Sequence, residues 1–251
     1  MPLRVGFDLD GTVADMFSAL HREAVKLFGE EVLRKAAYKT SKPQEVKGEQ
    51  SNRKESSEPK EEEDEQATNA AMQELHLTSR QQSQLWDHVR TMENFWTTLP
   101  ELEPGIISRI AKTARDRRWE VIFLTTRPAT AGDLVQLQSQ QWLEAHGFQY
   151  PSVFVVQRSR GKIADALQLD AFVDDRPENC LDIAVESKAK VILVWHGNPK
   201  DVPAGAKRLG VRPVTTISEA VRLLEQLDDI RSEPSLMRTI KRAFSGASSD
   251  I

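Results

Sequence analysis

Two aspartates near the amino terminus are spaced to act together on one bound ion or substrate. Asp8 and Asp10 stand two residues apart at the end of the apolar run 5–9, and Gly11 and Thr12 turn the chain directly afterwards. Alternation along a strand aims both carboxylates the same way, at the carboxyl edge where open α/β sheets bind ligands. Two like charges this close need a cation. Mg²⁺ is the natural candidate, because a hard ion can bridge carboxylates to a phosphate oxygen and leave one carboxylate free to attack. A solvated Asp-Gly turn is the alternative.

Further polar side chains follow two other apolar runs and begin one helical pattern. Because the carboxyl ends of parallel strands meet at one edge of a sheet, we expect these side chains to lie near the first acid pair. Hydroxyl groups, basic groups and a second acid pair would then surround one ligand. They are Thr125, Thr126 and Arg127 after the run 121–124, Lys162 at the head of a helical pattern, and Asp174 and Asp175 after the run 171–173.

These segments resemble, in order, the four signatures of the haloacid dehalogenase-like (HAD) phosphohydrolase superfamily. The matching strings are DLDGT at 8–12, IFLTT at 122–126, Lys162, and FVDD at 172–175. By that resemblance Asp8 is the nucleophile that forms an aspartyl-phosphate, and Asp10 is the general acid and later the general base. The resemblance also implies a role in holding the phosphoryl oxygens for Thr125 and Lys162. The implied Mg²⁺ ligands are Asp8, Asp10 and either Asp174 or Asp175.

The second aspartate narrows the chemistry. A positioned acid contributes about 10²- to 10⁴-fold to expulsion of an alkoxide, so Asp10 favours phosphate ester hydrolysis over dehalogenation. It does not exclude a phosphomutase. A phosphomonoester is itself anionic, so Mg²⁺ and Lys162 would have to neutralise charge before Asp8 could approach. The sequence therefore predicts a Mg²⁺-dependent phosphomonoester hydrolase.

Several of these side chains also have ordinary structural interpretations. Lys162 could be an exposed lysine at the start of a helix. Thr126 and Arg127 could cap the following turn, or they could contact the substrate. Arg176 and Asn179 could cap a helix or contribute to the site.

Composition points to one folded domain with a charged insertion. The chain has 251 residues, 39% of them hydrophobic, a net charge of -4 and a sequence pI near 5.8. This charge favours no duplex nucleic acid partner, and no apolar run is long enough to span a membrane. The segment 41–68 is so poor in apolar residues that we expect it to be disordered, with a long solvated helix around 58–71 as the alternative. The single cysteine, Cys180, fits a reducing, cytoplasmic location.

The remaining pattern predicts a Rossmann-like parallel sheet with a small α-helical cap of type I. The core would comprise 1–15 and 101–228, and the cap 16–40 and 69–100. The tail 229–251 would carry a short helix. Thr78 and Gln81 form the capping box of a cap helix. Strands are expected at 121–124, 153–156, 171–173 and 191–195 besides the first, and helices to about 114 and at 134–145, 162–167, 179–186 and 218–227.

The substrate class rests on a second resemblance. The string ENFWTTLPELEPG at 93–105 resembles the cap–core junction of the cytosolic and mitochondrial 5'(3')-deoxyribonucleotidases. That resemblance implies a nucleoside monophosphate substrate whose base stacks on Phe95 or Trp96. A polynucleotide or sugar-phosphate phosphatase is the alternative enzyme. A regulatory or scaffolding protein with a non-catalytic HAD-like core is the alternative outside catalysis. The sequence does not predict the oligomeric state.

Overall fold

A single parallel β-sheet forms the centre of the molecule. The computed structural model describes residues 2–31, 33, 75–157 and 159–232. The predicted insertion at 41–68 and the predicted short helix of the tail lie outside these residues. The sheet has six strands in the order β3-β2-β1-β4-β5-β6, and every adjacent pair is parallel. The strands are β1 (Arg4–Asp8), β2 (Glu120–Thr125), β3 (Ser152–Val155), β4 (Ala171–Asp174), β5 (Lys190–Val194) and β6 (Arg212–Val214).

Helices connect the strands and cover both faces of the sheet, as parallel connections require. They are α5 (Ile106–Arg117), α6 (Val135–Ala145), α7 (Arg160–Ala166), α8 (Pro177–Glu186), α9 (Ala204–Arg208) and α10 (Ile217–Ser232). The 3₁₀ turns η1 (Phe95–Thr97) and η2 (Pro199–Asp201) complete the connections. None of the described helices is both long and apolar enough to cross a membrane.

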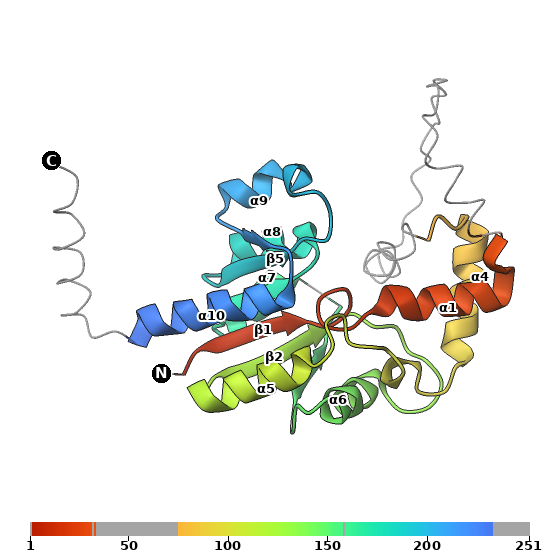
Figure 1. Cartoon of the computed structure of the whole chain (residues 1–251), viewed down its shortest axis with the longest axis horizontal. Helices are drawn as coiled ribbons and strands as arrows, with labels where there is room; N and C mark the ends of the chain where they lie inside the picture. The colour runs from red at the N-terminus through yellow and green to blue at the C-terminus, as the bar shows by residue number, and fades with distance from the viewer. Residues whose placement is uncertain (1, 32, 34–74, 158, 233–251) are drawn as a thin grey trace, which may run out of the picture.

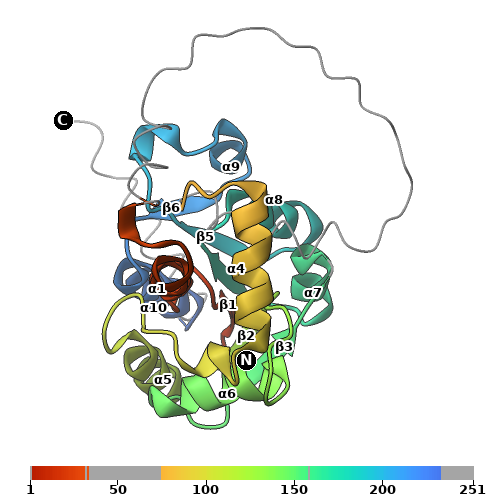
Figure 2. The same ribbon diagram turned by 90° about the vertical axis from the view of Figure 1, so that its right-hand side faces the viewer.

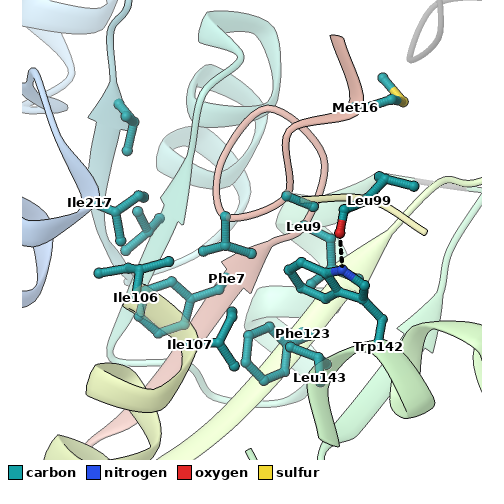
Figure 3. Close-up of a cluster of buried hydrophobic side chains, with 14 of the residues drawn as sticks. Phe7, Leu9, Met16, Leu99, Ile106, Ile107, Phe123, Trp142, Leu143 and Ile217 are labelled. Carbon is teal, nitrogen blue, oxygen red and sulfur yellow. Dashed lines mark hydrogen bonds between the residues drawn. The ribbon is translucent and has the colours of Figure 1, made fainter. Parts of the chain in front are cut away.

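Two hydrophobic clusters lie on opposite faces of the sheet. One joins α5, α6 and α10 to side chains such as Phe7 and Phe123, and Figure 3 shows these rings with Trp142 and Ile107 around them. Trp142 also donates its indole N–H to the carbonyl of Leu99 at 2.7 Å, which ties α6 to the segment before α5. The other cluster joins α7, α8 and α9 to the second face. This doubly wound arrangement confirms the predicted α/β core.

Two further helices, α1 (Met16–Phe28) and α4 (Ser79–Thr91), lie apart from the sheet beyond the carboxyl end of β1 (Figure 1). Figure 2, viewed from that side, shows α4 in front of the strands. We call α1 and α4 the helical pair. The largely buried Glu23 of α1 accepts a hydrogen bond from His88 of α4 at 3.1 Å. The capping box predicted at Thr78 and Gln81 is present at the start of α4.

Strand register brings the predicted site segments together. Phe7 pairs with Val173 across β1 and β4, so Asp8 and Asp174 are the next residues on neighbouring strands. Asp8 pairs with Leu124 of β2, one residue before Thr125. The acid pair of β1, the hydroxyls of β2 and the acids of β4 therefore share one edge, as predicted.

The end of the sheet and the last helix differ from the sequence prediction. The short edge strand β6 was not predicted because it contains Pro213. Proline weakens a strand pattern and is confined to sheet edges. Helix α10 extends to Ser232, beyond the expected end at 227. Its last turns are held by ion pairs from Arg117 to Asp229 and from Arg231 to Asp170, rather than by apolar residues.

Candidate active site

Three carboxylates meet at the carboxyl edge of the sheet. One oxygen from each of Asp8, Asp174 and Asp175 lies within 4.8 Å of the others. Asp8 ends β1 and Asp174 ends β4, and both side chains are buried. Both members of the second acid pair belong to the cluster, whereas the sequence left open which one would. Asp10 is not in this group of carboxylates, although it was predicted to bind the same metal ion.

The cluster holds more negative charge than its protein surroundings neutralise. Burial raises the pKa of Asp8 to about 7 despite the opposing effect of Arg160, and the neighbouring carboxylates of Asp174 and Asp10 add to the rise. Burial, followed by the charges of Asp8 and Asp174, also raises the pKa of Asp175 well above its ordinary value. Burial is the main cause of both rises and repulsion between the carboxylates adds to it, so a bound cation would favour the ionised forms.

The turn after β1 is shaped to admit the third carboxylate. Gly11 has a φ of +80°, which glycine adopts without a steric penalty. A Cβ atom at this position would lie 2.3 Å from an oxygen of Asp175. Thr12, the next residue, donates its hydroxyl to Asp175 at 2.9 Å. The Gly-Thr pair after the first acids therefore makes room for Asp175 and orients it.

Arg160, and not the predicted Lys162, is the basic residue that contacts the carboxylate cluster in the structure. Its Nη1 donates to Asp8 at 2.6 Å and to Asp174 at 2.7 Å, and its Nη2 donates to the hydroxyl of Thr126 at 3.2 Å. Burial tends to lower the pKa of this guanidinium, but Asp8 and Asp174 outweigh that effect and raise it.

The structure does not bring Lys162 to the carboxylate cluster; its side chain is exposed. Arg160 is the first residue of α7, which Ser159 caps. A residue two positions later projects about 200° around the helix and cannot point to the same place. The Ser-Arg start of this helix was the available signal, since it places Arg160 nearest to the sheet edge.

Asp174 is held in place by the start of α8. The backbone N–H of Arg176 donates to its Oδ1 at 2.9 Å, and the side-chain amide of Asn179 donates to both of its oxygens at 3.1 Å. Asn179 therefore orients an acid of the cluster. Arg176 also lines the adjoining pocket, and its guanidinium has no hydrogen-bond or ion-pair partner within the described ranges.

Asp10 belongs to a different ionic pair. Arg127 binds its carboxylate through Nε and Nη2, with distances between 2.8 and 3.0 Å. Thr125 donates its hydroxyl to Oδ2 of Asp10 at 3.2 Å. Thr125 and Arg127 were predicted to hold substrate atoms, but in the structure they hold Asp10.

A pocket of about 330 Å³, including the part open to solvent, joins the two ionic groups. This volume is at the small end of ligand pockets. Thr126, which was predicted to contact substrate, lies in its wall. The other lining residues are Asp8, Asp10, Met16, Trp96, Arg127, Pro128, Arg160 and Arg176.

Phe95 and Trp96, predicted to stack on a nucleobase, are buried side chains of η1. Their rings meet edge to face with centroids 5.0 Å apart. The guanidinium of Arg127 lies over the Trp96 ring, 4.9 Å from its centroid. Trp96 borders the pocket but is fully buried, so neither ring offers an open stacking surface. The η1 turn packs both rings inward, as core side chains.

The carboxylate cluster fits a hard divalent cation. It offers oxygen donors from three side chains, and burial together with repulsion from neighbouring carboxylates raises the pKa of two of them, Asp8 and Asp175. Carboxylate oxygens are the ligands that Mg²⁺ prefers. Asp8, Asp174 and Asp175 are thus the residues that would hold the ion.

Known structures support the fold. No protein-family model and no curated protein sequence matches the chain. A predicted phosphatase from Clostridium acetobutylicum is similar in structure, with a TM-score of 0.50 and 14% identity over 90% of this chain and 99% of that one. A dehalogenase with an intermediate complex has a TM-score of 0.52 and 15% identity, over 88% and 96% of the two chains.

A haloacid dehalogenase-like hydrolase from Streptococcus pneumoniae has a TM-score of 0.50 and 13% identity, over 89% and 98%. At these identities the similarity shows the fold, and the fold is HAD-like, as the sequence predicted.

Proposed function

We propose that this protein is a Mg²⁺-dependent phosphomonoester hydrolase that works through an aspartyl-phosphate on Asp8. The observation that carries the proposal is one pocket bordered by two ionic groups of different kinds. On one side, Asp8 belongs to a carboxylate cluster short of positive charge. On the other side, Asp10 lines the same pocket but stands outside that cluster. The carboxylate cluster could bind a cation that in turn binds an anionic substrate. Asp10 could transfer a proton to or from that substrate.

The hydrogen bonds of Asp8 suggest which of its oxygens attacks. Oδ1 accepts the 2.6 Å hydrogen bond from Arg160, whereas Oδ2 lies 3.4 Å from the hydroxyl oxygen of Thr12, which donates its one hydrogen to Asp175 at 2.9 Å. Oδ2 is therefore the less engaged oxygen. In the first step a bond forms between this oxygen and phosphorus, the ester P–O bond breaks, and Asp10 gives a proton to the leaving alkoxide.

The second step releases phosphate. Asp10, now ionised, takes a proton from water as the water oxygen attacks phosphorus, and the bond between phosphorus and Asp8 breaks. Arg160 keeps the Asp8 carboxylate in place during both steps. Bound Mg²⁺ would supply positive charge that offsets the repulsion between the anionic ester and the attacking carboxylate. The helical pair would act as the cap that the sequence predicted.

A nucleoside monophosphate is the narrower version of this proposal. Its support is the sequence of the junction at 93–105, because the buried rings of Phe95 and Trp96 no longer provide it. Arg176 is the pocket cation best placed to contact an anionic substrate, since Arg127 and Arg160 are committed to protein carboxylates.

A panel of phosphate esters, assayed for phosphate release with and without Mg²⁺, tests the proposal. It should contain deoxynucleoside 5'- and 3'-monophosphates, sugar phosphates, a 3'-phosphorylated oligonucleotide and an aryl phosphate. We expect Mg²⁺-dependent release from at least the aryl phosphate and one natural class. Failure with every ester would favour the non-catalytic alternative. Preference for sugar phosphates or the oligonucleotide would overturn the nucleotide version alone.

A further inference from the structure

Arg127 binds the carboxylate of Asp10 in a bidentate arrangement. Its Nε donates to Oδ1 at 3.0 Å and to Oδ2 at 2.9 Å, while Nη2 donates to Oδ1 at 2.8 Å. The side chain of Arg127 has no exposed surface, whereas 13% of the Asp10 side chain is exposed. Both residues line the pocket, and Asp10 is the more accessible of the two. Such paired contacts fix the orientation of a carboxylate as well as its charge.

The rest of the guanidinium is enclosed by protein. Its remaining nitrogen, Nη1, donates to the hydroxyl of Ser139 at 2.9 Å, and that hydroxyl donates to a backbone carbonyl of α6. The group lies 4.9 Å from the Trp96 ring centroid and 6.0 Å from that of Trp142. Each nitrogen of the guanidinium has a protein partner and the side chain has no exposed surface, so the protein holds Arg127 in one orientation.

The enclosure is built from the junction that leads to the helical pair. Trp96 donates its indole N–H to the carbonyl of Pro128 at 3.0 Å and its backbone N–H to Gln138 at 3.1 Å. Just before η1, Glu93 forms a β-bridge with Ala131. The junction and the segment that follows Arg127 are thus joined at several points, and the junction sets where the guanidinium lies.

We propose that Arg127 is a positioning residue that aims Asp10 at the leaving group, and that Trp96 holds Arg127 in place from the junction. The proposal rests on the proposed function, in which Asp10 is the proton donor. It gives the paired aromatic residues of the junction a role in supporting the proton donor rather than in stacking on a base.

The proposal predicts a loss that depends on the leaving group. An alkoxide needs a proton as it departs, whereas a nitrophenolate departs readily without one. The measurement is kcat/KM for an alkyl phosphate and for p-nitrophenyl phosphate, because kcat/KM reports the steps up to cleavage of the ester bond. A defect in folding or in the pocket alone would lower both values by the same factor.

The first variant is Arg127→Lys, which keeps the charge but cannot present two parallel N–H groups. We expect kcat/KM for the alkyl phosphate to fall by about 100-fold, at the low end of what a general acid contributes, and the aryl value by less than about threefold. Arg117→Lys is the matched control, because Arg117 also binds two aspartates but lies on α5, outside the residues that line the pocket. It should leave both values unchanged.

A double-mutant cycle tests whether Arg127 acts through Asp10. In the Asp10→Asn background, Arg127→Lys should lower the alkyl value by less than about threefold more, because the group that it positions is already lost. A full, multiplicative loss in that background would overturn the proposal.

A milder variant covers the case in which Arg127→Lys fails to fold. Trp96→Phe removes the indole N–H and weakens the cation–π contact with Arg127. If this costs about 1 kcal/mol of positioning, kcat/KM for the alkyl phosphate should fall selectively, by about 3- to 10-fold. Trp119→Phe, which also loses an indole hydrogen bond in the core, is its control and should change neither value. Equal losses for the two esters in whichever variant folds would overturn the proposal. A wild-type protein inactive on both esters would instead overturn the proposed function and this inference with it.

Discussion

Arg160 and Arg127 are both buried beside the same pocket, yet they differ in the number of carboxylates around them. Arg160 contacts Asp8 and Asp174, and Asp175 completes a group of three carboxylates around one guanidinium. Arg127 forms an ion pair with a single carboxylate among the described residues, that of Asp10, so that pair is balanced. The difference separates two jobs that residue types alone do not distinguish. The unbalanced side calls for a cation and an anionic substrate, while the balanced side holds one carboxylate in a fixed orientation.

Asp8→Asn should have the largest effect of any single substitution on the unbalanced side. An amide is a poor nucleophile, so kcat should fall by a factor on the order of 10³ or more. Phosphate release from an aryl phosphate measures this loss, and circular dichroism checks the fold. Near-normal activity would show that the nucleophile lies elsewhere.

Substitution of Arg160 should break the unbalanced side, whereas substitution of Lys162 should not. Arg160→Met leaves buried carboxylates without their partner, and we expect the free energy of unfolding in Mg²⁺-free urea titrations to fall by about 3 to 5 kcal/mol. Lys162→Met removes an exposed side chain and should change it by about 0.5 kcal/mol at most. If Lys162→Met were the more damaging substitution, the assignment of the site cation to Arg160 would be wrong.

Mg²⁺ should stabilise the protein through the unbalanced side only. At about 100 times its Kd, an ion that binds only the folded state adds about 2.7 kcal/mol to the free energy of unfolding. Asp174→Asn should abolish most of this gain, while Asp10→Asn should retain it. The rise of the melting temperature on addition of Mg²⁺ measures the effect. If Asp10→Asn abolished the stabilisation by Mg²⁺ and Asp174→Asn retained it, the ion would bind beside Asp10 and not in the carboxylate cluster.

We expect the smallest effect in the helical pair. It tests whether a carboxylate far from Arg127 and Arg160 makes stability depend on pH. Burial by itself would raise the pKa of Glu23, but hydrogen bonds from Lys26 and His88 outweigh it and lower the pKa below the ordinary value of 4.5. A lowered pKa stabilises the fold above that value, and the contribution is lost as pH falls through the folded-state pKa, below about 4.5. Glu23→Gln should therefore cost about 1 kcal/mol at pH 7 and less at lower pH. Melting temperatures of both proteins between pH 7 and 3.5 measure this, and parallel curves would contradict it.

The sequence by itself determined the sheet apart from its edge strand β6, the edge at which the site lies and the identity of its acids. Apolar runs that end in polar residues, separated by helical patterns, specify parallel strands whose carboxyl ends meet. Asp8, Asp174 and Asp175 came together for that reason, because short-range alternation and register were enough to place them.

Tertiary structure alone decided which basic group serves which acid, and which rings are open to solvent. Arg160 and Lys162 differ by two residues, but only the start of α7 and its docking on α8 select the one that faces the edge. Arg127 follows a strand as a substrate-binding residue would, but the packing of Trp96 and Trp142 turns it toward Asp10. Long side chains reach several partners from one backbone position, so their contacts depend on what packs around them and not on their place in the chain.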